Sequence, residues 1–121
     1  MEACREADRA LLVGHVEYVP DELVAEVLAT ERVHPWSINQ RGDKWRLCHD
    51  YSVGTNLVAK SGPFSLPTPW DVRATVKPDT HFAKYDLRDG FWNCTIAWSD
   101  RRKLLTRHPA TQRLMWCRSP D

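Results

Sequence analysis

The sequence lacks any long hydrophobic run. No stretch of its 121 residues approaches the roughly 20 apolar residues that a transmembrane helix needs. The apolar run Leu11-Leu12-Val13 is also too short for the hydrophobic region of a secretory signal. We therefore expect no membrane partner and an intracellular location, in the cytoplasm or the nucleus.

Closely spaced cysteines are also lacking. Cys4, Cys48, Cys94 and Cys117 lie far apart and form no Cys-x-x-Cys motif, and the five histidines show no zinc-ligand spacing with them. Scattered single cysteines are typical of proteins from reducing compartments. We expect neither a zinc site nor a disulfide partner.

The chain has almost no net charge, because 17 Lys and Arg face 16 Asp and Glu. A net charge of +1 creates no global field that would attract nucleic acid. The basic residues are unevenly placed, however. Residues 101–118 contain no acid and six cations: Arg101, Arg102, Lys103, Arg107, Arg113 and Arg118. This basic segment could follow a phosphate backbone, or it could be a solvated hairpin rich in arginine.

The residues that are present fit one globular domain. Hydrophobic residues make up 42% of the chain and charged residues 27%, and six tryptophans supply large apolar side chains. Residues 1–12 could form a short helix. Residues 21–30 place apolar side chains on one helical face, with Asp21 as the expected N-cap. Thr68-Pro69-Trp70-Asp71 is typical of another helix start, with Thr as the cap.

Strand patterns occupy much of the remaining chain. Residues 44–51 alternate between two faces after turn residues at 37–43, which predicts a half-buried strand. The other strand-like segments are 81–86, 91–98 and a possible hairpin of 103–107 with 113–117. The pattern predicts an α+β domain with a mainly antiparallel sheet and two or three helices.

Asp86 ends the apolar run of residues 81–86. A carboxylate at the end of a buried strand is costly unless it is paired or bound to a cation, and Mg²⁺ takes one or two protein carboxylates. On its own, Asp86 is better explained as a turn or N-cap residue. Asp89 could be a second ligand, but its offset of three suits a turn. A phosphotransferase with a nucleophilic Asp86 is disfavoured, because Arg88 stands where such enzymes carry a second acid.

Lys44 and Arg46 share one face of the expected strand with Asp50. Two cations on one face could hold a triphosphate, with the Arg guanidinium in bidentate geometry. A same-face ion pair between Arg46 and Asp50 on a wet surface explains the pattern equally well.

Several segments together resemble the reverse transcriptases of retrotransposons, over roughly residues 30–118. The segments occur in the family's order: KWRLCHDYSVGTN, LPTPWDV, FAKYDLRDGFW, RRKL and RHPATQRLMW. Lys44-Trp45-Arg46 with Asp50-Tyr51, and the segment from Phe82 to Phe91, are the most specific pieces. The resemblance implies the fingers and a partial palm of an RNA-directed DNA polymerase.

The resemblance assigns roles to individual residues near Asp86. Asp86 matches the family's first catalytic aspartate, a ligand shared by two Mg²⁺ ions, and Leu87 would offer its backbone carbonyl to a metal. Asp89 and Gly90 match a turn whose amides hold the incoming triphosphate. Phe91 matches an aromatic gate that rejects a ribose 2′ hydroxyl by steric clash.

The resemblance also reaches the expected strand before residue 52. Arg46 matches an arginine that lies against the triphosphate, and Lys44 would be its companion. Asp50 and Tyr51 match the acid and aromatic that close the fingers strand. The spacing from Asp50 to Asn56 is one residue longer than in retroviral enzymes.

The resemblance also implies a domain organisation and a set of partners. We expect a helical segment at 1–30, the polymerase-like region at 31–118 and a divergent tail at 119–121. The parent enzyme would use deoxynucleoside triphosphates and an RNA or DNA template-primer. No segment matches the Asp-Asp hairpin that supplies the family's remaining metal ligands, so we expect no catalysis by this chain alone. The alternative is a non-catalytic remnant of a mobile element that binds nucleic acid weakly or not at all.

Overall fold

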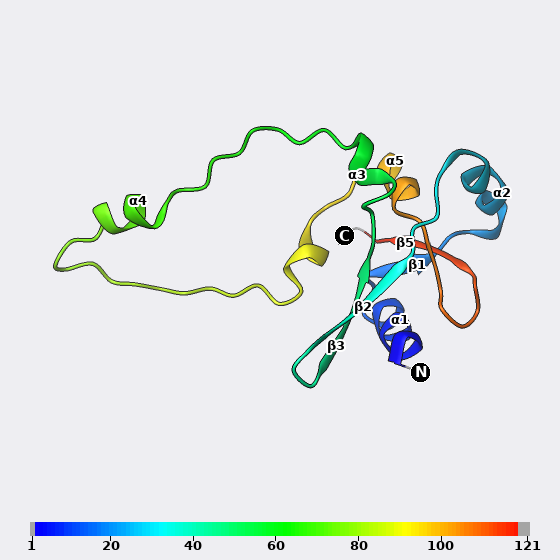
Figure 1. Ribbon diagram of the computed structural model, residues 1–121, viewed down its shortest axis with the longest axis horizontal. Helices are drawn as coiled ribbons and strands as arrows, with labels where there is room; N and C mark the ends of the chain where they lie inside the picture. The colour runs from blue at the N-terminus through cyan, green and yellow to red at the C-terminus, as the bar shows by residue number, and fades with distance from the viewer. Residues whose placement is uncertain (1, 119–121) are drawn as a thin grey trace.

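A computed structural model describes residues 2–118 and confirms an α+β protein with antiparallel sheets (Figure 1). The three-stranded sheet has the order β1 (Val16–Tyr18), β5 (Leu114–Cys117), β4 (Thr106–Arg107). The second sheet is a hairpin of β2 (Trp36–Arg41) and β3 (Lys44–His49). The predicted divergent tail at 119–121 lies outside the described residues.

The described residues contain five short α-helices, where two or three were predicted, and all of them except the helix at Pro69–Ala74 lie around these sheets. They are α1 (Glu2–Leu12), α2 (Asp21–Thr30), α3 (Thr55–Val58), α4 (Pro69–Ala74) and α5 (Trp98–Arg101), with 3₁₀ turns η1 (Gly90–Asn93) and η2 (Arg102–Leu104). The predicted first and second helices and the helix start at Thr68 are therefore confirmed. The N-cap prediction for Asp21 was wrong. Pro20 occupies the cap, and Asp21 lies in the first turn, where a carboxylate interacts favourably with the helix dipole.

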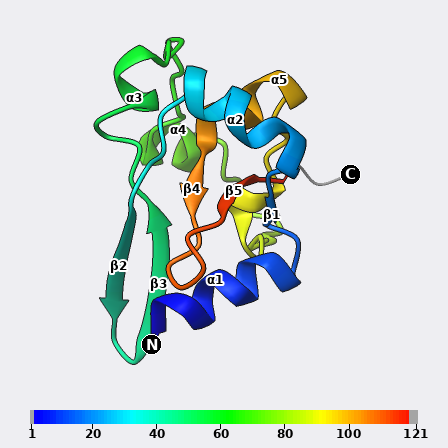
Figure 2. The same ribbon diagram turned by 90° about the vertical axis from the view of Figure 1, so that its right-hand side faces the viewer.

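The core forms where α2 packs against the three-stranded sheet. All four residues of β5, the central strand, are buried, because β1 and β4 cover both of its edges. The main apolar cluster consists of Val19, Val27, Leu105, Leu114 and Trp116. Figure 2 shows the three-stranded sheet with the β2–β3 hairpin alongside it and α1 across one end. Residues from both ends of the chain thus share one sheet.

The β4–β5 hairpin fits the sequence pattern, whereas the β2–β3 hairpin fits it only in β3 and in the turn. The β4–β5 pairing, with Thr106 opposite Met115, confirms the predicted hairpin of 103–107 with 113–117. The β2–β3 hairpin turns at Gly42, whose φ of 61° favours glycine, and at Asp43. Residues 37–41 were expected to belong to the turn and instead form most of β2. They pair residue by residue with β3.

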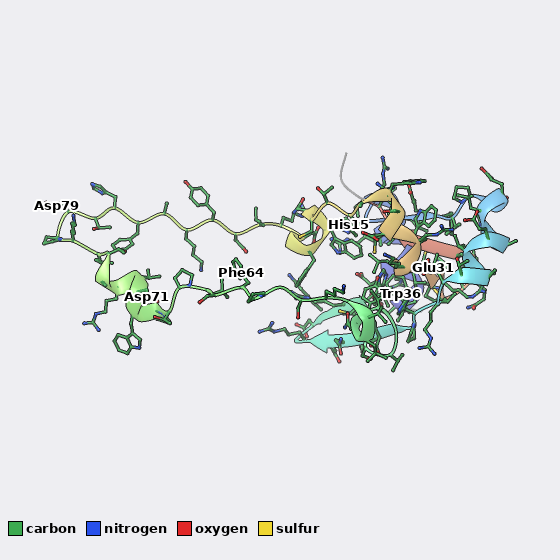
Figure 3. The ribbon with its side chains drawn as sticks, turned by 90° about the horizontal axis from the view of Figure 1, so that it is seen from above. His15, Glu31, Trp36, Phe64, Asp71 and Asp79 are labelled. Carbon is green, nitrogen blue, oxygen red and sulfur yellow. The ribbon has the colours of Figure 1, made fainter. Side chains whose placement is uncertain are left out.

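Residues 59–87, which we call the arm, project away from the body (Figure 1). Apart from Thr80, every residue of the arm is exposed. Helix α4 lies towards its far end, where Thr68 and Asp71 form a reciprocal capping box. In Figure 3, Phe64, Asp71 and Asp79 mark the arm from its outgoing limb to its far end. The arm is therefore held by local turns and caps rather than by a core of its own.

The strands predicted at 81–86 and 91–98 are not formed, and those predictions were wrong. Residues 81–87 are extended without a paired strand, residues 90–93 form η1, and Trp98 begins α5. An extended segment becomes a strand only when a neighbour takes up its backbone hydrogen bonds. Along the arm, no described segment lies in register to do so.

Candidate functional site

Lys44 and Arg46 lie on an exposed face of β3. Lys44 is opposite Arg41, and Arg46 is opposite Asn39 in β2. The Asp50 carboxylate accepts hydrogen bonds from the backbone amide (3.0 Å) and the hydroxyl (2.6 Å) of Ser52, and these bonds lower the pKa of Asp50. No ion pair between Arg46 and Asp50 is present among residues 2–118. Both cations remain accessible to a phosphate ligand.

Asp86 and Leu87 lie on the returning limb of the arm. Both are exposed, Leu87 to 73% of its surface. The rigid, buried strand end expected for Asp86 is therefore absent, because residues 81–86 have no pairing strand in the part of the chain that is described. The role of Asp86 as a metal ligand remains a prediction.

A turn begins two residues after Asp86. In this turn Asp89 has a positive φ of 53°. The Asp89 carbonyl accepts a hydrogen bond from the Trp92 amide at 2.8 Å. The turn prediction is confirmed for the backbone. Phe91 is 93% exposed at the surface of this turn and is available to a ligand.

The described residues do not assemble a complete metal site. No group of three or more His, Cys, Asp and Glu within residues 2–118 lies close enough to hold a metal ion. Asp86 offers Mg²⁺ a single carboxylate. No hydrogen bond, ion pair or ring contact in that range joins Asp86 to Lys44 or Arg46. The candidate residues therefore form two separate exposed groups, one on β3 and one around the returning limb.

A buried polar cluster, which sequence reasoning missed, joins the β2–β3 hairpin to β5. The Tyr51 hydroxyl bonds Nδ1 of His49 and lies 3.6 Å from Sγ of Cys117. Burial raises the pKa of the Cys117 thiol and of the Tyr51 hydroxyl. It also lowers the pKa of His49 to about 4, with a further contribution from His34. At neutral pH all of these groups are uncharged, so the thiol is no nucleophile and the cluster is structural.

His34 holds a second part of the same region together. Its Nδ1 donates to the Leu105 carbonyl at 3.3 Å, while Nε2 accepts from the Thr55 amide at 3.2 Å. The ring also packs edge-on against Tyr51, with ring centroids 4.8 Å apart. The spacing of His34, His49, Tyr51 and Cys117 in the sequence carries no periodic signal, which is why only the fold reveals the cluster.

His108 and Asp8 resemble a catalytic His–Asp pair, with 3.0 Å between Nε2 and Oδ1. The other ring nitrogen, Nδ1, accepts hydrogen bonds from the backbone amides of Ala110 and Thr111. Nδ1 thus holds the β4–β5 turn, and Nε2 connects that turn to Asp8 of α1. This pair has no free nitrogen to act as a general base.

Most cations of the basic segment are engaged within the protein. Arg101 lies 3.1 Å from Glu17, and Arg113 lies over the ring of Tyr18, with its guanidinium carbon 3.9 Å from the centroid. The other ion pairs are Arg118 with Glu17, Arg102 with Glu26 and Glu31, and Lys103 with Asp100. These contacts reduce the charge that the segment offers to a phosphate backbone.

Comparisons with known proteins supply no family for this geometry: no protein-family model, no curated protein and no solved structure matches the chain. None of the helices described is both long enough and apolar enough to cross a membrane.

Proposed function

We propose that this chain is a fragment of an RNA-directed DNA polymerase, comprising fingers and a partial palm. In the complete enzyme it would contribute Asp86, with the Leu87 carbonyl, to two Mg²⁺ ions. A deoxynucleoside triphosphate would be contacted by Lys44, Arg46, Asp89 and Gly90. Phe91 would exclude a ribose 2′ hydroxyl by steric clash. The complete enzyme would copy an RNA or DNA template from a primer.

One structural observation supports the proposal beyond the motifs themselves. The segment around Asp86 carries large apolar side chains that the described part of the chain leaves exposed: Phe82, Tyr85, Leu87 and Phe91 are 73–93% exposed. A run of this kind beside a carboxylate suits one strand of a sheet whose other strands come from a further segment. A polymerase palm would provide such strands and would bring further acids to Asp86.

Catalysis by these 121 residues alone is not part of the proposal. The sequence contains no two adjacent aspartates. Nucleotidyl transfer depends mainly on electrostatic stabilisation by bound metal ions, and one carboxylate does not hold a metal pair. The isolated chain should therefore extend no primer.

The alternative is a non-catalytic remnant of a mobile element that binds nucleic acid weakly or not at all. The ion pairs of the basic segment favour weak binding, because paired cations release few counterions from a nucleic acid. This alternative shares the ancestry of the first proposal and differs in present activity.

Sequencing the genomic DNA and the transcript past codon 121, in all three frames, tests the proposal. A Leu-Pro-Phe-Gly segment followed by an Asp-Asp hairpin, in frame or one shift away, is the expected result. Unrelated sequence in every frame would contradict the proposal of a polymerase fragment and would favour the non-catalytic remnant of a mobile element.

A further inference from the structure

Trp92 connects the foot of the arm to the body. Its ring stacks on the ring of His15, with centroids 4.7 Å apart and planes only 1° from parallel. It also meets the edge of the His49 ring at 5.9 Å. The Asp89 carboxylate lies 3.8 Å from Nε2 of His15. Figure 3 shows His15 at the point where the arm meets the body.

The two histidines provide the contacts that hold this turn. The other bonds of the turn are internal: the Trp92 amide donates to Asp89, and the Asn93 side chain donates to the Arg88 carbonyl at 2.9 Å. Across residues 2–118, every ion pair and ring contact that joins residues 88–94 to the rest of the protein involves His15 or His49.

Both histidines belong to the well-packed part of the protein. The His15 carbonyl accepts a hydrogen bond from the Arg118 amide at 2.9 Å, next to the β1–β5 pairing. His49 ends β3 and packs edge-on against Trp36 at 4.0 Å. The imidazoles therefore form a fixed surface on which Trp92 docks.

His15 lies between opposing charges. Burial lowers its pKa, as does the Arg9 guanidinium from α1, while Asp89 in the turn acts in the opposite direction. Burial is the largest of these effects. Arg118 also approaches this region, with Nη1 3.6 Å from the position a Cβ on Gly14 would take. The Arg9 guanidinium and the Asp89 carboxylate thus act in opposite directions on a ring that Trp92 covers.

No carboxylate of residues 2–118 forms a hydrogen bond or ion pair with His49. Its neighbours are Tyr51 and Cys117, both uncharged at neutral pH, and His34, which lowers its pKa further. Nε2 of His49 is buried without a hydrogen-bond partner among the described residues. A charge on this ring would be poorly solvated while Trp92 remains docked.

We propose that Trp92, His15 and His49 form a latch that holds the foot of the arm at neutral pH and releases it in acid. Undocking Trp92 admits water to both imidazoles and so removes much of the cost of charging them. Proton uptake is then coupled to release, because the undocked form binds protons more readily. The latch is closed above about pH 7 and weakens as the pH falls below the ordinary His pKa of 6.5. The contacts and their test lie within this chain, so the latch does not depend on polymerase activity.

Hydrogen exchange of the full 121-residue chain, followed by mass spectrometry and corrected for intrinsic rates, tests the latch. Between pH 7.5 and 5.0, the protection of amides 88–94 should fall by roughly tenfold. This corresponds to a pKa difference of about one unit between the docked and the undocked form. Amides of β5 at 114–117 should remain better protected than amides 88–94 at pH 5.0, which excludes global unfolding as the route by which 88–94 exchange. Constant or increased protection of 88–94 in acid would overturn the proposal.

Three variants separate the latch from general packing. Trp92→Ala should remove the protection of 88–94 at both pH values. His15→Phe keeps an aromatic partner that takes no proton, so protection should persist at pH 7.5 and depend less on pH. His49→Phe provides the same test if His15→Phe fails to fold. Full pH dependence in both phenylalanine variants would contradict the latch.

Discussion

A methyl group on Gly54 would lie 2.4 Å from Nε2 of His34, closer than real side chains approach one another. The imidazole has little room to withdraw, since it is 97% buried and bonds both the Leu105 carbonyl and the Thr55 amide. This close approach fixes the start of α3 against the chain leading to β4.

Gly54→Ala should therefore lower the free energy of unfolding by about 1–3 kcal/mol, the usual cost of overpacking a fixed site. The matched control is Gly62→Ala, because a Cβ on Gly62 meets nothing within 4 Å. Urea unfolding followed by far-UV circular dichroism measures both variants. Equal midpoints for the two would show that His34 moves aside freely.

His49 should make the protein less stable in acid. It titrates at about 4 in the folded chain and near 6.5 when exposed. Between these values the unfolded chain binds a proton that the folded chain does not, so stability is full above pH 6.5 and falls towards pH 4. The expected loss is roughly 3 kcal/mol at most.

Urea midpoints of wild type and His49→Gln at pH 7.0 and 4.5 measure this contribution. The variant should lose less stability on acidification than wild type does. His81→Gln, on the exposed arm, serves as the control and should behave as wild type. If His49→Gln loses as much stability on acidification as wild type does, His49 is not the cause of the acid sensitivity.

Glu17 should be the most important acid of the body. Its Oε1 accepts from Nε1 of Trp116 at 2.9 Å and from Arg101 at 3.1 Å. Glu17→Gln should cost about 1–3 kcal/mol of stability, because the Arg101 side chain is only 13% exposed and would lose its charged partner. The exposed Glu22→Gln is the control, and thermal unfolding compares them. Indistinguishable melting temperatures for the two variants would mean that the bonds of Glu17 with Trp116 and Arg101 contribute nothing to stability.

The sequence predicts the fold well where contacts are local. The helix at 21–30 is specified by apolar spacing, and the β4–β5 hairpin by two short segments around a turn. The strand prediction at 81–86 was wrong for a different reason. An alternating or apolar run forms a strand only if a partner strand exists, and strand pairing depends on residues far away in the sequence. The buried cluster of His49, Tyr51 and Cys117 brings together residues up to 68 positions apart, which no local pattern encodes.

Phe91 should control sugar selection in an active enzyme. The test uses a chimera in which this chain is placed where an active retrotransposon reverse transcriptase has its fingers and partial palm. In that chimera, Phe91→Ala should raise ribonucleotide relative to deoxynucleotide incorporation by roughly tenfold or more, because a steric clash is removed. Phe64→Ala, which changes an exposed Phe of the arm, is the control. Unchanged discrimination would remove the role assigned to Phe91.

Primer extension by the same chimera, with Asp86 and with Asp86→Asn, tests the polymerase proposal most directly. Template-primer binding by both proteins, and the Asp79→Asn control on the exposed arm, report on folding. The account predicts that the chimera extends the primer and that Asp86→Asn lowers the rate by at least roughly 100-fold. A chimera that binds template-primer without extending it, or extension that survives Asp86→Asn, would contradict it.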